Sequence, residues 1–171
     1  MGMGAACKQT ITAIAAGRIL EAPPLGACTV EDLAAALPGL AAVADNIGTL
    51  GRGGSQVWWR AVRDGIAGHV LRVWHDGAGV LAIELERPEL DGGWPALRDQ
   101  LGAPSQRFDV VRDVVKLEEG LWFYRARGVA AQTSLGGARL DRVMAFPPTT
   151  ADDFIAHLVM SLVPLRDRPT G

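Results

Sequence analysis

The sequence predicts an α+β fold with two tandem halves, each a helix plus an antiparallel meander, and a C-terminal helix that packs on the sheet. Three observations indicate this: amphipathic helical segments end at proline or glycine, strand-like runs are separated by glycine-containing turns, and this order occurs twice. At 171 residues the chain fits a single domain, 1–171, with half-repeats at about 25–88 and 89–148.

The first helical segments carry recognisable ends. "KQTITAIAAGRILEA" spaces Ile11 and Ile14 at helical intervals and stops before the prolines at 23 and 24. In "TVEDLAAALPG", Thr29 is placed as an N-cap with Asp32 three positions later, which is close to a capping box. Both segments are therefore predicted to be short helices.

Strand-like runs follow. The first half offers "QVWWRAV", "HVLRVWHD" and "GVLAIELE", after a glycine-rich loop, "GTLGRGGS", and with Asp-Gly steps that favour hairpins. After a short helix in "GGWPALRDQLGAP", the second half offers "RFDVVRDVVKL", "GLWFYRAR", "GVAAQTSL" and "ARLDRVMAF". A closing helix at about 150–163 repeats the capping pattern with Thr150 and Asp153, and a polar tail follows it. The matching positions of "VWWR" and "LWFYR" suggest a duplicated unit.

Composition excludes several classes of function. The formal net charge is −2, and Lys8 and Lys116 are the chain's lysines, so a basic stripe for nucleic acid is not expected. No run approaches the ~20 apolar residues of a membrane span, and the first residues lack the charged and apolar regions of a signal peptide. Excess Ala, Gly, Arg and Val over Lys and Asn is typical of a GC-rich bacterial genome. We therefore expect a bacterial, cytoplasmic protein in which Cys7 and Cys28 are reduced.

The aromatic residues raise the question of core or binding surface. Side chains alternate along a strand, so Trp58 and Arg60 share one face while Trp59 takes the other. We expect the face away from the core to carry aromatics, arginines and a carboxylate: Trp58, Arg60, Arg72, Trp74 and Glu84. In the second half, Trp122 and Tyr124 share a face opposite Phe123 and Arg125. Exposed aromatics beside arginines are typical of protein-binding hot spots, although core packing of most of these rings is the main alternative.

No catalytic, cofactor or metal site is predicted. His69 and His75 lie on one strand, separated by roughly 20 Å, which is too far for a shared metal ion. His157 lies one helical turn after Asp153, which suggests a surface pair and not a catalytic dyad. The glycine-rich loop lacks the Lys-Ser/Thr of a phosphate-binding loop, and no nucleophile elbow is present. The sequence is thus not expected to encode an enzyme.

One part of the chain resembles a known family. The order "LRDQLGAPSQRF…GLWFYRARGVAAQTSLGGARLDRVMAF" resembles the helix-plus-sheet repeat of the beta-lactamase inhibitor protein and the related outer-membrane assembly lipoproteins, and is similar to small bacterial immunity-type proteins. "PLGACTVEDLAAALPG" resembles the helix entrance of the same repeat, so the resemblance covers about residues 25–148. It implies a sheet surface that binds another protein.

We therefore expect a non-enzymatic inhibitor or immunity-type protein that engages a protein partner, such as a bacterial toxin, through Trp58, Arg60, Arg72, Trp74, Trp122 and Tyr124. One alternative is a binding domain or cavity enzyme for a small anionic ligand, held by Arg60, Arg72 or Arg125. Self-association, with the aromatics buried against a second copy as a homo-oligomer, stays open as a third.

Overall fold

The computed structural model describes residues 3–63, 70–110, 119–134, 137–159 and 165–167. Its strands are β1 (Asn46–Leu50), β2 (Ser55–Val62), β3 (Val70–His75), β4 (Val80–Glu86), β5 (Gln106–Val110), β6 (Glu119–Tyr124), β7 (Val129–Ser134), β8 (Arg139–Ala145) and β9 (Leu165–Asp167). The helices are α1 (Met3–Ala15), α2 (Val30–Ala36), α3 (Gly93–Leu101) and α4 (Ala151–His157), and the 3-10 turns are η1 (Ile19–Glu21), η2 (Pro38–Leu40) and η3 (Arg125–Arg127). The predicted α+β class is confirmed.

All nine strands belong to one antiparallel sheet, in the order β1-β2-β3-β4-β8-β7-β6-β5-β9. Each half contributes a helix and then a four-stranded meander, α2 with β1 to β4 and α3 with β5 to β8. The halves meet where β4 pairs with β8, so β1 and β5, the first strands of the two meanders, lie far apart. Strands β2 and β6, which carry "VWWR" and "LWFYR", occupy equivalent places in the two halves.

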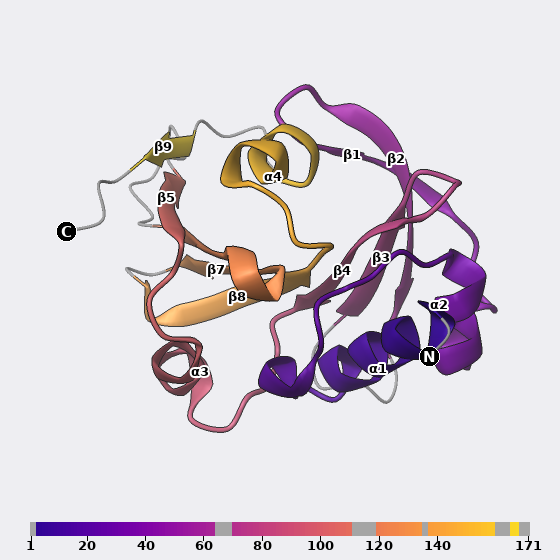
Figure 1. The fold of residues 1–171 in the computed structure, drawn as a ribbon, viewed down its shortest axis with the longest axis horizontal. Helices are drawn as coiled ribbons and strands as arrows, with labels where there is room; N and C mark the ends of the chain where they lie inside the picture. The colour runs from indigo at the N-terminus through magenta and orange to yellow at the C-terminus, as the bar shows by residue number, and fades with distance from the viewer. Residues whose placement is uncertain (1–2, 64–69, 111–118, 135–136, 160–164, 168–171) are drawn as a thin grey trace.

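Helices cover both faces of the sheet (Figure 1). Helices α1, α2 and α3 pack on one face, which we call the α1–α3 face, with a core that includes Leu71, Val73 and Ile83. Helix α4 packs on the other, the α4 face, through aromatic contacts: the Phe154 ring lies tilted against that of Phe146, with ring centres 4.6 Å apart. The sheet thus has two cores, because each face places apolar side chains under a helix.

Local interactions explain where the helices begin and end. Thr29 caps α2 with a full capping box, because its hydroxyl accepts the Asp32 N–H and the Asp32 carboxylate accepts the Thr29 N–H. Helix α1 ends at Ala15, just before Gly17, whose φ of 73° suits glycine, and the N–H of Arg18 reaches back to the Ala13 carbonyl. The helix starts earlier than the sequence predicted, and Ile19, once expected within it, belongs to η1.

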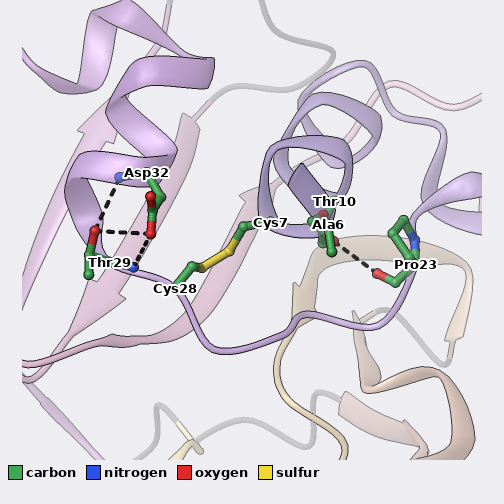
Figure 2. Close-up of a disulfide and its surroundings, with 7 residues drawn as sticks. All are labelled: Ala6, Cys7, Thr10, Pro23, Cys28, Thr29 and Asp32. Atoms are coloured by element: carbon green, nitrogen blue, oxygen red, sulfur yellow. Dashed lines mark hydrogen bonds between the residues drawn. A yellow bond between two sulfur atoms is a disulfide. The ribbon is translucent and has the colours of Figure 1, made fainter. Parts of the chain in front are cut away.

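The prediction of reduced cysteines was wrong. Cys7 of α1 and Cys28, just before α2, form a disulfide with a Cα–Cα distance of 6.2 Å (Figure 2). On the same helix, the Thr10 hydroxyl bonds the Pro23 carbonyl and that of Ala6. The sequence did not reveal this pairing, because only the packing of α1 beside the segment before α2 brings the two thiols together.

Three other expectations need correction. The glycine-rich loop is in part strand β1, where Gly48 is required because a Cβ would lie 2.7 Å from the Trp74 ring. Helix α4 ends at His157 and not near 163: the Ile155 carbonyl in its last turn accepts the Arg52 N–H at 3.2 Å, and the Val159 carbonyl just beyond it accepts the Gly51 N–H at 2.8 Å. The expected polar tail contains β9, which pairs with β5.

Candidate functional site

The predicted site residues do not share one face. In β2, Trp58 pairs with His75 and Arg60 with Val73, which puts both on the α1–α3 face. Arg72 and Trp74 lie on the α4 face beside Trp59, the register partner of Trp74. The alternation within each strand was correct, but placing Trp58 and Arg60 with Arg72, Trp74 and Glu84 was wrong. Which side chains of two neighbouring strands lie on the same face depends on the register between the strands, and local sequence does not specify that register.

On the α4 face, Arg72 belongs to a buried ion pair. Its NH1 lies 2.6 Å from Glu84 Oε1, and the Glu84 side chain is fully buried. The Arg72 guanidinium lies 4.8 Å from the Trp59 ring centre, and Trp74 Nε1 donates to the second Glu84 oxygen. Since Trp74 is only 3% exposed, this cluster stabilises the sheet and offers little surface to a partner.

In the second half, Trp122 and Tyr124 are structural as well. Trp122 lies edge-on to Trp94 of α3, with ring centres 5.4 Å apart, and Arg107 stacks over it at 4.5 Å. Tyr124 is 4% exposed, its hydroxyl has no hydrogen-bond partner among the described residues, and burial raises its pKa to about 12. Neither side chain presents a polar group suited to orienting a partner.

Trp58 is different, because it is held at the surface by a polar network. Its ring stacks on His75 with centres 6.2 Å apart, and 38% of the residue stays exposed. His75 Nε2 lies 2.9 Å from Asp45 Oδ1, and its Nδ1 accepts the Gly77 N–H, which indicates the tautomer with hydrogen on Nε2. The Arg60 Nε donates to the same Asp45 oxygen at 2.7 Å.

This network fixes charge beside the tryptophan. The hydrogen bond from Arg60 lowers the pKa of Asp45 below its ordinary value of 3.8, and the His75 contact acts in the same direction against the opposing effect of burial. The Asp45 carboxylate therefore stays ionised near neutral pH and holds both side chains in place. Sequence analysis missed Asp45, which precedes β1 and is distant in sequence from both of its partners.

Ile47 extends the exposed apolar surface. It is the register partner of Trp58 on the same face, and it is 66% exposed. Sequence analysis missed it because no strand was predicted before the glycine-rich loop, which was expected to begin at Gly48. The alternation of Ile47 and Thr49 around Gly48 was the available signal for a strand. We call Ile47, Trp58 and Arg60, together with Asp45 and His75 beside them, the β1–β2 surface.

The structure shows no metal or catalytic constellation within the described ranges. No group of three or more His, Cys, Asp and Glu there is suited to a metal ion. Both ring nitrogens of His75 are engaged, so the ring has no nitrogen left to act as a base. Asp153 bonds the Thr150 hydroxyl, whereas His69 lies outside the described residues. In the same ranges, no helix is both long and apolar enough to cross a membrane.

The arginines suggested for an anionic ligand are not gathered at one cavity. Arg60 pairs with Asp45 and Arg72 with Glu84, so their charges are already compensated. Arg125 is exposed in η3. A groove of about 330 Å³ between η1, α3 and the segment before α3 is lined by three carboxylates and Arg18, and contains none of those three arginines. This arrangement does not favour an anion site there.

The fold and this surface define a class: an α+β protein with two helix-plus-meander halves on one sheet, and an exposed tryptophan held at one end of it. Comparison of the chain with protein-family models, with curated proteins and with solved structures finds no match in any of the three. The resemblance to the beta-lactamase inhibitor protein repeat therefore stays a prediction.

Proposed function

We propose that this chain is a protein-binding protein, of the inhibitor or immunity type, which engages its partner through the β1–β2 surface. The observation that carries the proposal is that Trp58 remains exposed beside the exposed Ile47. Its ring stacks on His75, which is held by a hydrogen-bonded network with Asp45 and Arg60. A rigid exposed aromatic loses little entropy on binding, and its neighbouring charges give orientation.

The inhibitor type is supported by the predicted family resemblance, which implies a partner such as a bacterial toxin. The disulfide bears on where this partner would be met. Disulfide bonds persist in oxidising compartments and are rare in the cytoplasm. The Cys7–Cys28 disulfide therefore favours an oxidising compartment over the cytoplasmic location expected from the sequence. Binding to an extracytoplasmic partner is consistent with this bond.

The proposal is tested by comparing tagged wild type with Trp58→Ala as baits in lysate of the source, and by titrating each protein captured, once purified, into both forms. Loss of a hot-spot tryptophan costs about 2 kcal/mol, so we expect the dissociation constant to rise about 30-fold. Arg139→Ala is the control, because Arg139 is exposed on β8 and pairs only locally with Asp141. A partner that binds Trp58→Ala as tightly as wild type contradicts the proposal.

Circular dichroism separates a binding effect from a folding effect. Among the described residues the Trp58 ring stacks on His75, and the residue is 38% exposed, so Trp58→Ala should keep the wild-type spectrum. Trp122→Ala, its counterpart on β6, removes the contact with Trp94 and should lower the melting temperature instead. If both variants unfold alike, Trp58 is a core residue and the surface loses its central element.

A further inference from the structure

The β1–β2 surface ends at an edge of the sheet. Strand β1 is the first in the strand order, and β2 is its partner on one side. Among the described residues no strand pairs with its other side, so β1 is an end strand of the described sheet. Alternate residues of an edge strand direct their N–H and C=O groups outward, where they can pair with another extended segment.

Strand β1 lacks the features that usually prevent such pairing. Its residues, Asn46–Leu50, include no charged side chain and no proline. Its register with β2 is continuous over five pairs, so no bulge bends the edge away. Natural edge strands are commonly protected by lysine, proline or a bulge. The absence of all three within β1 indicates an edge suited to accept a strand.

The second half of the molecule shows an equivalent edge that is occupied. Strand β5 holds the place that β1 holds in the first half, since Ile47 pairs with Trp58 as Arg107 pairs with Trp122. There, β9 adds to the outer side of β5 as a short antiparallel strand, opposite Phe108, Asp109 and Val110. Positions 48–50 of β1 correspond to these three residues by register, and no strand of the described ranges covers them.

Side chains around the open edge indicate what an added strand would contact. On the α1–α3 face it would lie beside Ile47, with Trp58 one strand further in. On the α4 face it would lie beside Gly48, over which the Trp59 and Trp74 rings extend, since a Cβ there would meet both. An uncharged segment with apolar side chains is therefore suited to contact the residues on both faces of the sheet at this edge.

We propose that the partner binds through an extended, largely apolar segment that pairs antiparallel with β1, opposite Gly48, Thr49 and Leu50, as β9 pairs with β5. This mode rests on the proposed function, because it specifies how a protein partner reaches the β1–β2 surface. Main-chain hydrogen bonds supply the pairing, and Ile47 and Trp58 select apolar side chains.

The test uses the full-length oxidised chain and a phage-displayed library of random twelve-residue peptides as the probe. Selected peptides are synthesised, their binding is measured by fluorescence polarisation, and each backbone N–H is then replaced by N-methyl in turn. In a paired strand only alternate N–H groups face the sheet, so we expect affinity to fall tenfold or more at every second position. Thr49→Lys should weaken binding similarly, whereas Gln56→Lys, its exposed register partner on β2, should not.

Each other result overturns the strand-pairing mode. It is wrong if no peptide is selected, if N-methylation has no two-residue period, or if Thr49→Lys and Gln56→Lys behave alike. A concentration-dependent dimer that Thr49→Lys abolishes would identify a second copy as the occupant instead. The proposed function is judged separately. If binding of peptides or partners requires Trp58 but N-methylation shows no two-residue periodicity, the proposed function stands and only the strand-pairing mode is refuted.

Discussion

Breaking the Cys7–Cys28 bond should destabilise the protein by an amount that the structure allows us to calculate. The bond closes a loop with a sequence separation of 21, for which the chain-entropy relation gives about 3.3 kcal/mol at room temperature. Cys7 is fully buried and Cys28 nearly so, which means that the reduced thiols stay packed and the loss comes chiefly from the freed unfolded chain. Helix α1 should remain docked through Ile11 and Ile14.

The assay is urea denaturation of the oxidised and the reduced protein, followed by far-ultraviolet circular dichroism. With a urea dependence of about 2 kcal/mol/M, the midpoint should fall by about 1.6 M on reduction. The double variant Cys7→Ala and Cys28→Ala is the control, because its midpoint should be low and insensitive to reductant. Equal midpoints for the oxidised and reduced wild type, with complete reduction shown by thiol titration, would refute the reasoning.

Three further predictions concern single side chains. Glu84→Gln should lower the free energy of unfolding, measured by chemical denaturation, by about 3 kcal/mol, because it leaves the buried Arg72 charge poorly paired. Substitution of the more exposed partner, Glu86→Gln, should lower it by less than about 1 kcal/mol. Tyr124→Phe should leave the melting temperature unchanged or raised, since the buried hydroxyl has no hydrogen-bond partner among the described residues. A clear drop in the melting temperature would contradict this and indicate that the hydroxyl is hydrogen-bonded. Wild type should lose stability more steeply than Asp45→Asn as pH falls below 3.8, because the carboxylate whose pKa is lowered in the fold must then be protonated; parallel pH profiles would contradict this.

Much of the architecture could be predicted from local signals. The Thr29 and Asp32 capping box and the Thr150 cap both occur where the sequence placed them. Runs of alternating or β-branched residues predicted seven of the eight meander strands, β2 to β8. These features depend on neighbours within a few residues, so composition and spacing are enough to specify them.

The candidate site could be predicted only in part. Trp58 and Arg60 were named, but Ile47, Asp45 and the role of His75 were not. Conversely, Trp74 and Tyr124 were named and are buried. Whether an aromatic strand residue is exposed depends on which helix covers its face, and α4 arrives over the sheet from the far end of the chain.

The sequence by itself determined the types of most elements other than β1 and β9, the order of helix and meander in each half, and which residues alternate within each strand. Tertiary structure alone decided the pairing of β4 with β8, the register that separates Trp58 from Trp74, the Cys7–Cys28 bond and the place of β1 at the end of the described sheet. The physical reason is the sequence separation of the interacting residues. Helix caps and turns form between residues a few positions apart, whereas register, disulfide pairing and exposure depend on contacts between segments that are distant in the chain.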